Sequence, residues 1–178
     1  MVSKIVWTTP KSWSVGELVT AANLNLHVRD NMNFLYNIPR YRAFRTTALS
    51  ITNATTIGLD CDSQRYDIGG LFAPTDNSFT TNITGLWTMM CGYQLVSGTW
   101  GGVQSCLIST GVTTIAEIMW QRNSTNAEEQ SLSVTGHKVL SASTVVDNTG
   151  WQNSGSARNT TITVDFIDCW HAGSWKGA

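Results

Sequence analysis

Three histidines are the residues with which this sequence could most readily carry out acid–base catalysis: His27, His137 and His171. They fall in three separate segments, a predicted helix, a predicted strand and the region after the last predicted strand. No GxSxG, HExxH, GxGxxG or P-loop pattern accompanies them. Acidic residues are sparse in the strand-rich part, which disfavours a pair of catalytic carboxylates. We therefore expect a protein that is not an enzyme and that has no cofactor.

One tryptophan stands out as a candidate ligand contact. Trp100 lies between glycines in residues 98–102, so a loop tip there would present its indole to solvent. Such a ring can stack on a sugar. The alternative interpretation is a hairpin turn closed by one aromatic side chain, which needs no ligand.

The cysteines do not form a metal-binding or redox motif. They are widely separated, and no CxxC pair occurs, which argues against a zinc knuckle and a thioredoxin-like site. We expect buried free thiols and no metal site. The four residues are Cys61, Cys91, Cys106 and Cys169.

The composition indicates one well-packed domain with a short appendage. The chain has 178 residues, of which 42 % are hydrophobic and 13 % charged, and its net charge is −1. This composition argues against disorder, and the lack of a basic excess argues against binding to nucleic acid or anionic membranes. No apolar run is long enough for a membrane span, and the first residues lack the apolar core of a signal peptide. We expect a soluble chain that is not exported.

Charge divides the chain into two unequal parts. Residues 1–45 contain six Lys or Arg and two acids, whereas the remainder contains five and ten. Between Asp67 and Glu117 the only charged residue is Asp76, which predicts faces covered by other protein. We place the boundary between an N-terminal attachment segment, 1–41, and a head, 42–178.

The N-terminal part is predicted to be an extended arm followed by one short helix. Pro10 and Gly16 interrupt any regular period in the arm. Thr20 is a good N-cap, and a helix can continue to about Tyr36 before Pro39. Two apolar stripes fit this helix: a heptad seam that contains Asn31, and a stripe against a globular neighbour that contains Met32 instead. The residues expected to anchor the chain are Trp7, Pro10, Trp13, Leu24, Val28 and Leu35.

From Arg42 onward the sequence predicts β-strands. The clearest alternation runs from Leu86 to Val96, and a second from Ile162 to Phe166 precedes a tail whose Trp170 and Trp175 we expect to be packed. Strands without intervening helices favour an antiparallel sandwich, most simply a jelly roll. Shorter candidates are Ser50–Leu59, Val103–Ile108, Thr114–Gln121, Leu132–Leu140 and Ser143–Asp147. The residues expected in the core or the trimer contact are Trp87, Met89, Cys91, Tyr93, Leu95 and Phe166.

Several motifs of the head resemble those of C1q-like domains. They include an opening Phe-Arg strand, a Tyr-Asp-x-Gly-Gly turn and a Gly-Leu-Trp strand. A late Trp-Gln-Asn-Ser-Gly segment and a closing strand follow in the same order. The resemblance implies a trimeric jelly roll of the C1q and tumour-necrosis-factor (TNF) type. No collagen-like stalk precedes the head, and the aspartates match no calcium-binding positions, so no metal ligands are carried over. The motifs lie at 44–46, 66–72, 79–80, 85–87, 151–155 and 162–170.

The N-terminal segment resembles the opening of virion structural proteins of tailed bacteriophages. The shared features are the spacing of Trp, Gly-Glu, Thr-Ala and Arg-Asp-Asn within residues 7–31. The resemblance implies a phage particle as the location, with assembly in the host cytoplasm.

Two functional hypotheses follow. In the first, the chain is a non-enzymatic virion protein whose N-terminal segment binds other virion proteins and whose homotrimeric head is displayed as a decoration, head fibre or tail-associated knob. In the second, the same trimer is an adhesin that binds a host-surface glycan through Trp100. The two share a fold and differ in whether the exposed surface has a ligand.

Overall fold

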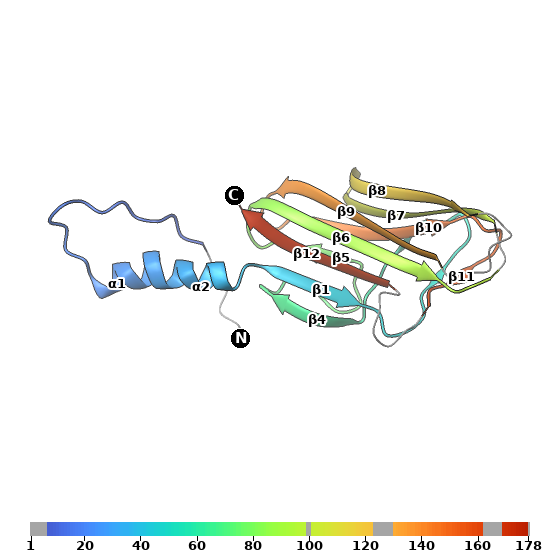
Figure 1. Cartoon of the computed structure of the whole chain (residues 1–178), viewed down its shortest axis with the longest axis horizontal. Helices are drawn as coiled ribbons and strands as arrows, with labels where there is room; N and C mark the ends of the chain where they lie inside the picture. Colours follow the sequence, from blue (N-terminus) through green and yellow to red (C-terminus); the bar gives the residue numbers. More distant parts are fainter. Residues whose placement is uncertain (1–6, 99–100, 123–129, 162–168, 178) are drawn as a thin grey trace.

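The computed structural model describes residues 7–98, 101–122, 130–161 and 169–177. They form a two-sheet antiparallel sandwich, and an extended arm and one helical stretch project side by side from one end of it (Figure 1). We call this projecting unit, residues 7–36, the hairpin. The helical stretch comprises α1 (Ala21–Leu24), the π turn η1 (Asn25–Arg29) and α2 (Asp30–Tyr36). No helix in these ranges is both long and apolar enough to cross a bilayer.

The first sheet places the last described strand in its centre. Its order is β4-β1-β12-β6-β9, so the first strand of the head pairs with the last. Within it, Arg42 lies opposite Ala172, and Ala172 lies opposite Met90. The strands are β1 (Arg40–Phe44), β4 (Ser63–Ile68), β6 (Gly85–Leu95), β9 (Gln130–Leu140) and β12 (Cys169–Gly177).

The second sheet has the order β3-β10-β7-β8, with β5 also paired to β10. Two further short strands pair with each other, β2 (Ser50–Ile51) and β11 (Arg158–Asn159). The predicted strand over 50–59 is therefore wrong as a single element, because β2 and β3 pair with different partners. The strands of this sheet are β3 (Ile57–Gly58), β5 (Ser78–Thr80), β7 (Gly102–Thr110), β8 (Thr113–Arg122) and β10 (Val145–Gln152).

The core lies between the inward faces of the two sheets. Alternate residues of β6 point into it, because successive side chains of a strand face opposite ways. Trp87, Met89, Cys91, Tyr93 and Leu95 are all buried there, within the subunit's own core. The uncharged run 68–116 thus supplies much of this core, and contact of its outward-facing residues with neighbouring subunits stays a prediction. The predicted core residue Phe166 and the strand Ile162–Phe166 lie outside the described residues.

Two sets of polar contacts give local roles to residues of the motifs that resemble those of C1q-like domains. Asp67 accepts hydrogen bonds from the backbone N–H groups of Leu71 (2.9 Å) and Phe72 (3.1 Å). Gly69 and Gly70 between them have φ of +115° and +65°, a region that favours glycine. In the later motif, the buried Gln152 side chain donates to the carbonyl oxygen of Ile51 at 2.9 Å and thereby fixes β2 against the end of β10.

β12 depends on a glycine at a crowded point of the core. A side chain at Gly173 would come within 2.7 Å of Tyr41 Cε1, so two aromatic rings occupy the space above the strand. Trp175 on the same strand packs edge-on against Phe34 of α2, with ring centroids 5.3 Å apart. Phe34 is fully buried, and this contact fixes the helix to the end of the sandwich.

Candidate assembly surfaces and binding groove

The outward face of the first sheet is apolar and hydroxyl-rich. Leu86 and Val139 lie directly opposite each other on β6 and β9 and are 39 % and 68 % exposed. Met90 follows on the same face and is 38 % exposed. Isolated apolar side chains are common on surfaces, but neighbouring ones on a sheet face indicate a contact surface. We call this set, with its neighbours Thr88 and Thr135, the outer face of the first sheet.

Trp170 closes one end of this outer face. Gly92 lies opposite it on β6, and a side chain there would come within 2.9 Å of the Trp170 indole nitrogen. The Arg42 guanidinium lies 5.7 Å from the Trp170 ring centroid, a cation–π arrangement. Among the described residues the indole N–H has no hydrogen-bond partner and is shielded from solvent. The ring therefore covers Gly92, and Trp170 itself is only 8 % exposed.

The charged groups of the outer face are of one sign. Arg40 and Arg42 lie on β1, and no described residue that points outward from this sheet is acidic. His137 forms a 3.0 Å hydrogen bond with the Thr88 hydroxyl across β6 and β9. The face therefore offers a partner apolar and neutral polar groups together with these two arginines.

The N-terminal arm folds back along the helix instead of extending away from it (Figure 1). Asn31 is buried and accepts a hydrogen bond from the Thr8 N–H (3.0 Å) while donating to the Thr8 carbonyl oxygen (2.7 Å). Trp7 packs against Phe34 with ring centroids 5.7 Å apart. The arm therefore occupies both polar atoms of the Asn31 amide. The predicted heptad seam, in which Asn31 would face a second helix, is wrong in this respect.

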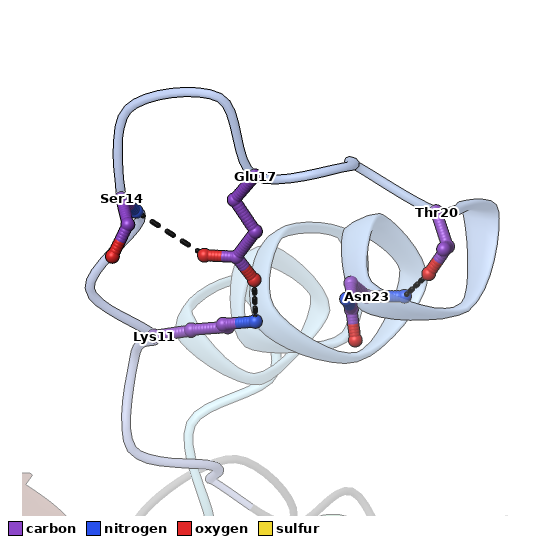
Figure 2. Close-up of polar contacts among 5 residues, drawn as sticks. All are labelled: Lys11, Ser14, Glu17, Thr20 and Asn23. Atoms are coloured by element: carbon purple, nitrogen blue, oxygen red, sulfur yellow. Dashed lines mark hydrogen bonds and ion pairs between the residues drawn. The ribbon is translucent and has the colours of Figure 1, made fainter.

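The distal end of the hairpin is fixed by polar contacts (Figure 2). The Glu17 carboxylate pairs with Lys11 and accepts a hydrogen bond from the Ser14 N–H at 3.2 Å. The bond from Lys11 is the main reason why the pKa of Glu17 is lowered, and the Ser14 bond adds to it. Thr20 accepts from the Asn23 N–H at 3.2 Å, so the helix begins at the predicted N-cap.

One side of the hairpin is left apolar and exposed. The arm covers the side of the helix that bears Asn31 and Phe34, whereas Leu24, Val28 and Leu35, spaced to form one stripe, remain 44 to 56 % exposed. Met32 belongs to this stripe and is 65 % exposed. Trp13 is 40 % exposed, and its ring packs edge-on against His27, while Pro10 is exposed. The stripe, rather than Trp7, is the part of the hairpin free to meet another protein.

The structure does not bring the three histidines together. His27 lies beneath the arm, His137 on the outer face of the first sheet and His171 in the core. Within the described residues, no group of three or more His, Cys, Asp or Glu is arranged to hold a metal ion. Trp100, the predicted ligand contact, lies outside the described residues.

The cysteines are free and buried. The Sγ atoms of Cys91 and Cys106 are 3.0 Å apart and belong to different sheets. The hydrogen bond with Cys106, and then burial, raise the pKa of Cys91 well above its usual value. The bond with Cys169, and then burial, do the same for Cys61. All four cysteines are thus core side chains, and the thiols of Cys61 and Cys91 stay protonated.

A shallow groove lies on the second sheet, on the side away from the core. Its volume is about 270 Å³. It is lined by Thr56, Ser105, Leu107, Glu117, Met119, Thr149, Gly150 and Trp151. The sequence motif containing Trp151 was interpreted only through its fold resemblance, so this groove was missed.

Known proteins resemble this chain in fold but not in sequence. No family profile matches the chain, and no curated protein does. Among solved structures, murine APRIL at pH 5.0 has a TM-score of 0.56 at 9 % identity, over 78 % of this chain and 99 % of that one. Eiger TNF from S. frugiperda has a TM-score of 0.52 at 8 % identity, over 79 % and 94 %. The globular domain of zebrafish complement 1qA scores lower, 0.46 at 11 % identity, over 77 % and 96 %.

The fold is a jelly roll of the C1q/TNF type. This confirms the predicted fold class, including the antiparallel sandwich and the short helix before it. At identities this low, the likeness concerns the path of the chain and the packing of its sheets. It assigns no ligand to the head.

Proposed function

We propose that this chain is the subunit of a homotrimeric, non-enzymatic structural protein of a bacteriophage virion. In this proposal the outer face of the first sheet joins the three heads, and the hairpin attaches them to the particle. The observation that carries the proposal is the pair of apolar surfaces that a single subunit leaves exposed, Leu86, Met90 and Val139 on the sheet and the helix stripe 24–35.

Self-association is supported by the fold and by the chemistry of the outer face. Jelly rolls of the C1q/TNF type form homotrimers. In a ring of three, this face meets a different surface of the next copy, and Leu86, Met90 and Val139 are the exposed apolar side chains that it contributes to the contact. A closed ring of three copies buries this face once per subunit and leaves none exposed.

Attachment through the hairpin is supported by its shape. The helical stretch projects from the end of the sandwich (Figure 1). The side chains of its apolar stripe remain exposed although the arm lies along the helix. A helix of about four turns is marginal alone, so packing must stabilise it. Phe34 and Trp175 provide that packing at one end, and a binding partner would complete it along the stripe.

The assignment to a virion is supported by the N-terminal sequence. The spacing of Trp, Gly-Glu, Thr-Ala and Arg-Asp-Asn resembles that of phage structural proteins, and the structure gives these residues local roles. Glu17 closes the turn of the arm, Thr20 caps the helix and Asn31 binds the arm. Under this proposal the chain is found on virions assembled in the host cytoplasm. The three forms of this proposal, a head decoration, a head fibre and a tail-associated knob, differ in where the trimer is attached to the particle.

Self-association is tested with two single variants, each of which replaces one exposed valine with aspartate. Val139→Asp puts a charge on the outer face, whereas Val112→Asp puts the same charge in the turn between β7 and β8, where Val112 is 103 % exposed. In sedimentation equilibrium, the unmodified full chain and Val112→Asp should be trimers and Val139→Asp should be a folded monomer. A folded trimer for Val139→Asp would exclude this face, and a monomeric unmodified chain would exclude self-association.

Attachment is tested on particles. An antibody raised against the full chain should label purified phage particles in the electron microscope. A double variant, Val28→Asp with Leu35→Asp, should remain trimeric but be lost from particles. Particles that carry no label with the unmodified chain would refute the virion assignment. Retention of the double variant would show that the stripe is not the attachment surface.

A further inference from the structure

We propose that the groove on the second sheet is a binding site for an uncharged pyranose sugar residue of a glycan. This inference goes beyond the structural role proposed above and does not depend on it. The groove lies on β7, β8 and β10, whereas the surfaces proposed for assembly lie on the first sheet and the hairpin. Each proposal can therefore fail without the other.

The groove is built by the register of three neighbouring strands. Ser105 of β7 lies opposite both Trp151 of β10 and Met119 of β8. Two residues further along β7, on the same face, Leu107 lies opposite Thr149 and Glu117. β7 thus forms the floor, and β10 and β8 form the two walls.

The floor is held rigid from the core side. The Tyr93 hydroxyl, buried between the sheets, lies 2.9 Å from the carbonyl oxygens of both Ser105 and Trp151. It can donate to either of them. This places the two strands at a fixed separation directly beneath the groove, and a preformed site loses less entropy when it binds.

The lining has the chemistry that a sugar ring requires. A pyranose presents a face of C–H groups that packs on an aromatic ring, and Trp151 supplies an indole. The ring edge carries hydroxyl groups that both donate and accept, and Thr56, Ser105 and Thr149 supply matching hydroxyls. The Thr149 Oγ1 is shielded from solvent and has no partner among the described residues. A buried polar atom left unpaired is costly, so a ligand hydroxyl would be favoured here once the Thr149 side chain turns toward the groove.

Charge selects among sugars and against other ring-bearing ligands. Glu117 is the one ionisable residue of the lining, and its exposed carboxylate can accept hydrogen bonds from two adjacent sugar hydroxyls. No Lys, Arg or His lines the groove, so a uronate, a sialate or a nucleotide phosphate would meet an unpaired negative charge. The volume of about 270 Å³ is close to the lower end of ligand pockets, about 300 Å³, and suits one ring.

The test uses the full chain and free monosaccharides. Saturation-transfer NMR is recorded with glucose, galactose, mannose and N-acetylglucosamine as neutral probes, and with glucuronate as the anionic probe. At least one neutral sugar should receive saturation and glucuronate should not. Trp151→Ala and Glu117→Ala should each weaken binding at least tenfold.

A matched control separates the groove from general effects of losing a tryptophan. Trp120 neighbours Met119 on β8, is 53 % exposed and does not line the groove, so Trp120→Ala should leave binding unchanged. Because Glu117 is exposed, Glu117→Ala should retain the far-ultraviolet circular dichroism of the unmodified chain even if Trp151→Ala does not. Absence of saturation in every neutral sugar would overturn the proposal. Equal binding of glucuronate, or binding unaffected by Glu117→Ala, would overturn it as well.

Discussion

His171 should make the stability of this protein fall steeply in mild acid. Its imidazole is fully buried, with Nδ1 2.9 Å from the Tyr41 hydroxyl and Nε2 3.4 Å from the Asp76 carbonyl oxygen. A carbonyl oxygen can only accept, so Nε2 carries the proton and Nδ1 accepts from Tyr41. Burial lowers the pKa of His171 to about 4 from its ordinary 6.5, although the hydrogen bond to Asp76 opposes the shift.

The sign and size of the effect follow from this shift. A histidine whose pKa is lower in the folded state takes up a proton more readily when unfolded, so acid favours unfolding. The stability is fully present above about pH 7.5 and is lost as pH falls from 6.5 toward 4. At about 1.4 kcal/mol for each pKa unit, the difference of about 2.5 units corresponds to a loss of about 3 kcal/mol.

The assay is urea unfolding at fixed protein concentration between pH 7.5 and 4.5, for the unmodified chain and His171→Gln. Glutamine does not titrate, and its amide can serve the same two partners. Burial raises the pKa values of Asp60 and Asp147, which stabilises the fold in acid, so His171 is isolated by the difference between the proteins. The unmodified chain should lose about 2–3 kcal/mol more than the variant. Equal losses in both would refute the reasoning.

Three further predictions concern packing. Gly173→Ala should destabilise the chain by about 1–3 kcal/mol, because the new methyl group would lie 2.7 Å from Tyr41 Cε1, and an unchanged melting temperature would contradict this. Asn31→Ala should release the arm, so the Thr8 amide should exchange with solvent at least about tenfold faster while the amides of β6 are unaffected. The four buried thiols should not react with an aromatic disulfide reagent at pH 8 until urea unfolds the chain, and rapid reaction of any thiol in the native state would contradict their burial.

Period-two alternation predicted the strands that have one wet and one buried face. β6 begins and ends one residue before the predicted range, and β9 extends two residues beyond its predicted start. The N-cap at Thr20 was equally local, since it needs only a hydroxyl and a free N–H nearby. Both features depend only on residues that are close together in the sequence, so they can be predicted from a single sequence.

The C-terminal strand was missed because its sequence does not look like a strand. Gly173 and Gly177 lower strand propensity and suggest a loop, and we expected a packed tail around Trp170 and Trp175. In the structure Gly173 belongs in the strand because Tyr41 and Phe79, distant in sequence, fill the space of its missing side chain. The strand therefore depends on Tyr41 and Phe79, which lie far from it in the sequence.

The groove shows the same dependence on long-range register. The sequence directed attention to Trp100, because flanking glycines suggest an exposed loop tip. Trp151 gave no such signal, since only the resemblance to C1q-like domains placed it, and that resemblance does not say which residues lie beside it. Only the pairing of β7 with both β8 and β10 brings Ser105, Glu117 and Trp151 onto one surface. A slip of one residue in either pairing would turn one wall toward the core and abolish the groove. A site on a sheet face is thus a property of strand register, and a search of the sequence for sugar-binding residues must begin from the paired strands rather than from exposed loops.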